Sequence, residues 1–150
     1  MEIVINEWLL HYSKADSDLK KKKIAYNFLV CLQNKQFKII VNWSSKFKEK
    51  FYHFWEDSKH DDRSNILFKL LSYLLFNSDK TELLMRNGIE LIPSEIIKIC
   101  PDDDLYLLEL AYYSKDRIII TMDERLIDRM KGHSDIRFFL PEEFLKNCCG

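Results

Sequence analysis

Several oxygen-bearing side chains of this sequence stand where expected strands end and expected helices begin. They are Asn6 and Glu7 after the first strand, Asp123 after the strand over residues 117–121, and Asp102, Asp103 and Asp104 at the start of the helix leading into that strand. Carboxylates pressed together raise each other's proton affinity, so such a cluster is costly unless cations occupy it. Oxygen-only ligand sets select hard ions such as Mg²⁺ or Mn²⁺. One hypothesis is that these side chains form a metal site. The other is that they cap helices, which is the commoner role of any single aspartate at such a position.

The chemistry open to such a metal site is phosphodiester hydrolysis. A bound metal lowers the pKa of a water and stabilises the charge that develops on a phosphate, so the protein needs no nucleophile of its own. Other catalytic patterns are missing from the sequence. The four histidines, His11, His53, His60 and His133, lack zinc spacing, and the three glycines are too far apart to form a phosphate-binding loop.

The elements that must position these residues alternate between strand and helix. Strands are expected over residues 2–6, 37–41, 117–121 and 136–140, and helices begin near Asp18, Lys46, Asp62, Pro101, Glu124 and Pro141. The region 81–99 is ambiguous apart from a short helix after Pro93. This alternation predicts an α/β fold, a three-layer α/β/α arrangement with a mainly parallel central sheet, whose ligand groups gather beyond the carboxyl ends of the strands.

Composition limits the classes of protein further. A chain of 150 residues with 47% hydrophobic side chains and only three glycines and three prolines is expected to form one domain over residues 1–150. Lys plus Arg (23) nearly balance Asp plus Glu (24), so nucleic-acid binding would depend on local patches. No stretch has the length and apolarity of a bilayer span and no secretory leader is evident, so we expect a cytoplasmic protein without membrane contact.

The four cysteines are not expected to be bonded. Cys31 and Cys100 read as small apolar residues, and the vicinal pair Cys148 and Cys149 suits neither a zinc knuckle nor a disulfide framework.

Three segments together resemble the C-terminal half of a PIN domain, a family of metal-dependent ribonucleases. They are DLYLLELA at residues 104–111, RIIITMDERL at 117–126 and FLPEEFL at 139–145. In that family an acidic residue starts a helix, an alanine follows two turns later, a hydrophobic strand ends in Thr-x-Asp, and the last strand runs into a Pro-Glu-Glu-Phe-Leu type of ending. The resemblance covers residues 102–145, whereas the N-terminal half matches mainly in its order of elements.

The resemblance implies an endoribonuclease that uses Mg or Mn. Asp104 and Asp123 match metal-facing acids, Asp103 could assist, and Glu49 falls at the acidic position of the helix after the second strand. The first strand departs from the family, because Asn6 stands where an aspartate is usual and Glu7 follows it. Three readings stay open: a nuclease using Glu7, a weakened nuclease using Asn6, or a PIN-like domain that binds without cutting.

The same resemblance suggests the partners. RNA could meet the lysines at positions 14, 20–23, 46, 48 and 50, although a lysine run is more often a solvated helix face. Small PIN-like ribonucleases often pair, so a homodimer or an antitoxin-like protein partner is a further expectation. In the alternative function, a catalytically weakened or inactive protein- or RNA-binding module, the aromatic helix over residues 47–55 would bind a partner, although its spacing also fits core residues.

Overall fold

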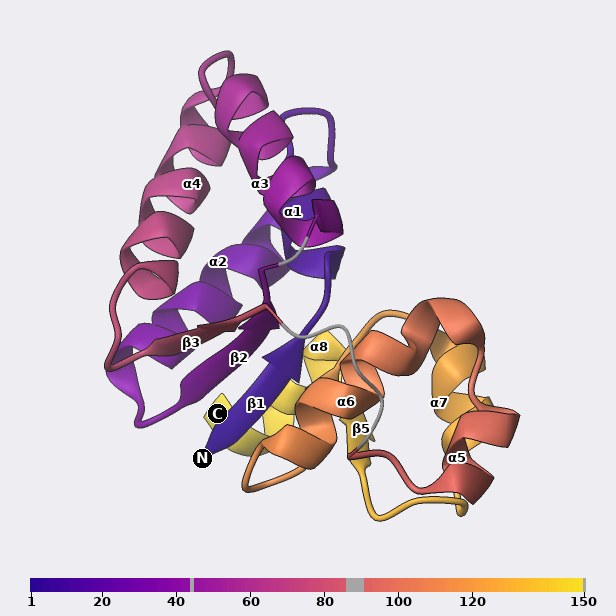
Figure 1. Cartoon of the computed structure of the whole chain (residues 1–150). Helices are drawn as coiled ribbons and strands as arrows, with labels where there is room; N and C mark the ends of the chain where they lie inside the picture. Colours follow the sequence, from indigo (N-terminus) through magenta and orange to yellow (C-terminus); the bar gives the residue numbers. More distant parts are fainter. Residues whose placement is uncertain (44, 86–90, 150) are drawn as a thin grey trace.

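The centre of the protein is a five-stranded parallel sheet (Figure 1). The computed structural model describes residues 1–43, 45–85 and 91–149. Its strands are β1 (Glu2–Ile5), β2 (Lys38–Asn42), β3 (Thr81–Leu84), β4 (Ile118–Ile120) and β5 (Arg137–Phe139). They lie in the order β3-β2-β1-β4-β5, and every pair is parallel. The predicted parallel α/β fold is therefore confirmed.

Helices cover both faces of this sheet. They are α1 (Trp8–Ser13), α2 (Leu19–Asn34), α3 (Ser45–Ser58), α4 (Asp62–Leu75), α5 (Ser94–Ile99), α6 (Leu105–Tyr113), α7 (Glu124–Met130) and α8 (Pro141–Phe144), with a 3-10 turn η1 (Asp102–Asp104) and a π-helical turn η2 (Leu145–Cys149). Figure 1 shows α1 to α4 on one side of the sheet and α5 to α7 on the other. None of the helices in the described ranges is long and apolar enough to span a membrane.

Two hydrophobic cores result from the alternation of side chains along the strands. Ile3 and Ile5 pack into the core beneath α1 to α4, whereas Val4 packs into the core beneath α5 to α7. Because a strand buried on both faces is apolar throughout, the β-branched run in β4 predicts an internal strand. The structure confirms this, since β4 lies between β1 and β5.

Helix α4 shows where the periodicity of the sequence misleads. Asp61 caps it, as expected, through a hydrogen bond of 2.9 Å from the Ser64 backbone N–H. The spacing of Ile66, Leu67 and Leu71 predicts one buried stripe, but 53% of Ile66 is exposed, whereas Leu67 and Leu71 are buried. Ile66 lies about 100° around the helix from Leu67, where it lines an open groove between α2 and α4 instead of the closed core.

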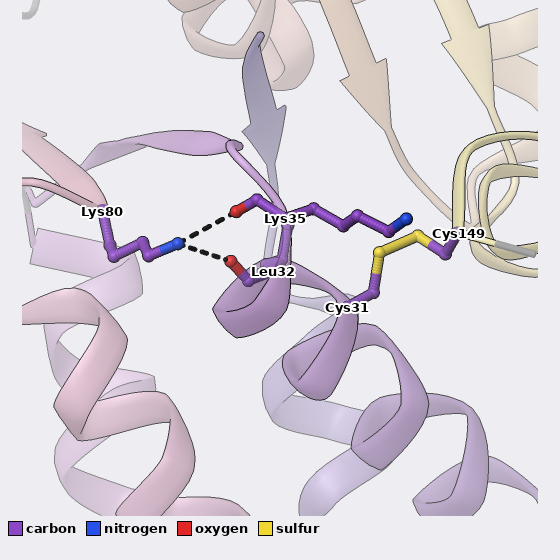
Figure 2. Close-up of a disulfide and its surroundings, with 5 residues drawn as sticks. All are labelled: Cys31, Leu32, Lys35, Lys80 and Cys149. Atoms are coloured by element: carbon purple, nitrogen blue, oxygen red, sulfur yellow. Dashed lines mark hydrogen bonds between the residues drawn. A yellow bond between two sulfur atoms is a disulfide. The ribbon is translucent and has the colours of Figure 1, made fainter.

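The expectation that no cysteine is bonded is wrong. Cys31 of α2 forms a disulfide with Cys149 of η2, with the two Cα atoms 5.8 Å apart (Figure 2). The partners are separated by 118 positions, and they meet only because the last turn of the chain returns to the end of α2. Beside this bond the Lys80 ammonium donates to the Lys35 carbonyl at 2.9 Å. Cys100 is buried and unbonded, as expected.

The ambiguous region contains a short edge strand and a short helix. Residues 81–84 form β3, and the expected helix after Pro93 is α5. In the sequence, Asn87 and Gly88 predict a break within this region, and both residues lie outside the part of the chain that the structure describes.

Candidate acidic site at the carboxyl edge of the sheet

The ends of the two central strands bring the first residues of the site together. Ile5 of β1 is in register with Ile120 of β4, so the residues that follow each of them leave the sheet side by side. The Asn6 side-chain amide donates to the Thr121 hydroxyl oxygen at 3.0 Å. The same oxygen accepts the Asp123 backbone N–H at 3.1 Å. Thr121 therefore links the loop after β1 to the loop that carries Asp123.

Both ends of the Asn6 amide group are used within the protein. Besides the bond to Thr121, the Asn6 carbonyl oxygen accepts the Trp8 backbone N–H at 3.3 Å, at the start of α1. The Trp8 indole N–H in turn donates to the Ile120 carbonyl at 3.0 Å. Asn6 thus ties the end of β1 to β4 and to α1, which is a positioning role that its sequence position did not indicate.

Helix capping does not account for the Asp104 carboxylate at this edge. It stands at the N-terminus of α6 and is half-buried, yet within the described chain its side chain makes no capping hydrogen bond. Burial raises the pKa of Asp104, and the negative charges of Asp123, Asp103 and Glu7 raise it further, while Lys46 lowers it. Asp104 therefore lies in a field of negative charge centred on the predicted site.

Asp123 follows β4 and does act as a helix cap. One of its carboxylate oxygens accepts the Leu126 backbone N–H at 3.1 Å, at the start of α7. The capping interpretation is thus correct for Asp123, but it does not exclude a second role. A carboxylate has about four lone-pair positions, and this hydrogen bond uses one of them.

Glu7 is half-buried and held by two neighbours. The Tyr106 hydroxyl of α6 donates to one Glu7 carboxylate oxygen at 3.4 Å, and the Lys50 ammonium of α3 lies 3.9 Å from the other. Burial raises the pKa of Tyr106, and the charges of Glu7 and Asp104 add to this effect. Tyr106 therefore remains a neutral donor at physiological pH, and Glu7 joins α3 to α6 across the carboxyl edge of the sheet.

Two of the predicted ligands lie at the exposed rim. Asp103 is exposed in η1, and it acts on Asp104 through its charge. Glu49 is exposed on α3, whose neighbouring residues Lys46 and Lys50 act on Asp104 and Glu7 respectively.

Sequence reasoning missed the parts played here by Tyr106, Thr121 and the pair Lys46 and Lys50. Lys46 and Lys50 are four residues apart, and this spacing could have predicted that both lie on the same face of the helix.

The donor chemistry of the site fits a hard cation only in part. Among the residues that the structure describes, no three His, Cys, Asp or Glu side chains are grouped so as to hold a metal ion. The negative charge of Asp123 raises the pKa of Asp104, and a cation between the two carboxylates would relieve this repulsion. Mg²⁺ commonly uses one or two carboxylates and keeps several waters, so a pair of acids is a sufficient protein contribution. Glu7 could join this pair through the lone-pair positions that its contacts with Lys50 and Tyr106 leave free, or in exchange for those contacts.

The class that fold and site define is an α/β domain with an acidic site at the carboxyl edge of a parallel sheet. No family model, no curated protein and no solved structure matches the chain. The geometry of this site and the sequence segments that resemble a PIN domain are thus the features that bear on function.

Proposed function

We propose that this chain is a PIN-like, metal-dependent endoribonuclease that hydrolyses RNA phosphodiester bonds with Mg or Mn. The observation that carries the proposal is the state of Asp104, a half-buried carboxylate whose pKa is raised by burial and by Asp123 and whose side chain caps no helix in the described chain. Such a group destabilises the fold unless a ligand gains from it, and a cation is the ligand that a carboxylate pair recognises.

In this proposal Asp104 and Asp123 hold the ion, and Glu7 is the candidate third acid. The ion supplies a bound water of lowered pKa and stabilises charge on the phosphate. Lys46 and Lys50 of α3 would bind phosphates of the RNA strand beside the acids. Asn6 has a positioning role, because its hydrogen bond to Thr121 fixes the loop that carries Asp123.

The remaining predicted acids, Asp103 and Glu49, are exposed and would act from the rim of the site, through outer waters or through charge.

A second candidate is a catalytically weakened or inactive PIN-like domain that serves as a protein- or RNA-binding module. The observation that favours it is the state of Glu7, whose carboxylate already has partners in Lys50 and Tyr106. Asn6 adds no charge to compensate. In this case Asp104 and Asp123 would be the remains of a ligand set, and a protein partner such as an antitoxin, or a second copy of the chain, would be the functional contact.

The surface for such a partner differs from the one that the sequence suggested. The aromatic helix α3 buries Phe47, Phe51 and Phe54, so only Tyr52 and Trp55 of its rings are exposed. A more apolar surface lies between α2 and α4, a groove of about 300 Å³. It is lined by Leu19, Lys22, Lys23, Tyr26, Arg63, Ile66 and Leu67. This groove, rather than the rings of α3, is the better contact for the second candidate.

The experiment that separates the two candidates is cleavage of a mixed-sequence RNA by the purified protein. Reactions contain Mn²⁺, Mg²⁺ or EDTA, and the wild type is compared with an Asp104→Asn, Asp123→Asn double variant. Asparagine can still accept the Leu126 N–H, so the cap of α7 survives. An Asp62→Asn, Asp79→Asn variant, altered at two exposed positions, is the matched control.

Metal-dependent cutting that the site variant loses and the control keeps supports the nuclease. No cutting by the wild type, or cutting that the site variant retains, contradicts the nuclease and leaves the binding module.

A further inference from the structure

A groove of about 490 Å³ runs between α7 and the edge strand β5, away from the α2–α4 face. One wall is formed by the side chains of Ile136, Phe138 and Leu140, which follow each other at alternate positions along β5 and its flanks. The other wall is α7, and Glu143 of α8 closes one end. The lining residues of the α7 side are Glu124, Ile127, Asp128, Lys131 and Gly132.

The backbone along this groove can accept another strand at Phe138. On either side of it the N–H groups of Ile136 and Leu140 already donate to the Ser134 hydroxyl and to Glu143, and the Leu140 carbonyl accepts the Phe144 N–H. β5 pairs only with β4 in the sheet that the structure describes, so its outer edge is open. The Arg137 N–H donates to the Arg117 carbonyl and the Phe139 carbonyl accepts the Thr121 N–H, so these two residues use their backbone groups toward β4. Backbone groups alternate along a strand, and the N–H and C=O of Phe138 therefore point outward. An unpaired edge of this kind is a template for an extended peptide.

The rim of the groove is negatively charged, which favours basic peptides over acidic ones. Glu124 and Asp128 lie one turn apart on the exposed side of α7, and Glu143 faces them from α8. Neither Glu124 nor Asp128 belongs to an ion pair between described residues. Lys131 is the one basic side chain among the lining residues. The rim thus carries a local excess of negative charge on a chain whose net charge is only −1.

We propose that this groove binds an extended, basic segment of a protein partner, which pairs with the outer edge of β5. Side chains at alternate positions of the segment would enter the groove, where apolar ones contact Ile136, Phe138 and Leu140 and lysine or arginine ones face Glu124 and Asp128. RNA does not fit, because its phosphates would meet carboxylates. A second copy of the chain paired through the same edge does not fit either, because a two-fold contact would bring the acidic rims together.

The test uses a fluorescent peptide of about eight residues in which valine and lysine take turns at the groove-facing positions, with threonine between them, and a matched peptide with glutamate in place of lysine. Binding is followed by fluorescence anisotropy at low salt. We expect the basic peptide to bind and the acidic peptide to fail. A Glu124→Gln, Asp128→Gln variant should weaken binding of the basic peptide by about tenfold, because two charge pairs at the rim are lost. The Asp62→Asn, Asp79→Asn variant should bind as the wild type does.

Hydrogen exchange of the Phe138 amide distinguishes strand addition from simple charge attraction. In the proposed complex this outward-facing amide becomes paired, so its exchange should slow when the basic peptide is bound. Three results would overturn the proposal: equal binding of both peptides, equal binding by the Gln variant, or unchanged exchange at Phe138 with the peptide bound. Displacement of the peptide by self-association, seen by sedimentation, would assign the groove to a second copy instead. The test is independent of RNA cleavage, so it stands or fails apart from the nuclease proposal.

Discussion

Replacing Cys31 with serine should lower the free energy of unfolding by about 2–5 kcal/mol, the usual cost of losing a native disulfide. The Cys31–Cys149 bond closes a loop with a sequence separation of 118. In the chain-entropy account, a loop of that length restricts the unfolded chain by about 5 kcal/mol at 25 °C, which sets the upper end of the range. Residual order in the unfolded chain lowers the stabilisation that the disulfide provides below this upper end.

The assay is equilibrium unfolding in urea followed by tryptophan fluorescence, with and without reductant. Cys148→Ser is the matched control, because Cys148 is the neighbouring free thiol. We expect Cys31→Ser and Cys149→Ser to lose similar stability, reduction of the wild type to reproduce the loss, and Cys148→Ser to keep the wild-type midpoint in the absence of reductant. The reasoning is refuted if reduction leaves the wild-type midpoint unchanged, or if Cys148→Ser costs as much as Cys149→Ser.

Two further predictions concern Asp104 and Asp18. Because the folded pKa of Asp104 is raised above 3.8, the stability linked to its protonation is present below that pH and is lost as pH rises through the folded pKa. Asp104→Asn should therefore raise the urea midpoint at neutral pH in EDTA and lose this advantage near pH 3; a lower midpoint at neutral pH would contradict the assigned repulsion. Asp18→Ala should destabilise the protein by about 1 kcal/mol, because Asp18 accepts the Lys21 N–H at the start of α2, whereas Asp18→Asn should cost less. Equal losses from both Asp18 variants in thermal unfolding would rule out the cap as the cause.

Much of the fold could be predicted because local signals and tertiary structure agree. The three consecutive isoleucines of β4 require burial on both faces, and only an internal strand of a covered sheet provides it. Asp18 and Asp61 mark helix starts through hydrogen bonds that span three residues, so their meaning is contained in the local sequence. Partners far apart in sequence carry no such signal, and for this reason the pairing of Cys31 with Cys149 was not foreseen.

The candidate site likewise contains features that could be predicted from the sequence and contacts that could not. That Asp104 and Asp123 lie at one edge was expected from the rule for the carboxyl ends of parallel strands and from the resemblance to a PIN domain, and the electrostatic influence of Asp123 on Asp104 agrees with it. The bonds of Glu7 to Lys50 and Tyr106 depend on how α3 and α6 sit across the sheet edge, which strand order alone does not give. The role of Asn6 depends on the register of β1 with β4, in which Ile5 is opposite Ile120.

Glu7 is the residue on which the two candidate functions differ most. In the structure the positive charge nearest to it is the Lys50 ammonium, 3.9 Å away and partly exposed, so the pairing is weak and can be exchanged. A divalent ion held by Asp104 and Asp123 would compete for Glu7 with twice the charge, and Lys50 would then be released toward the phosphate of a bound RNA. Metal and RNA binding would reinforce each other in such a nuclease. In a binding module the Lys50–Glu7 pair would instead persist when metal is added, because Asp104 and Asp123 would hold no ion to compete for Glu7.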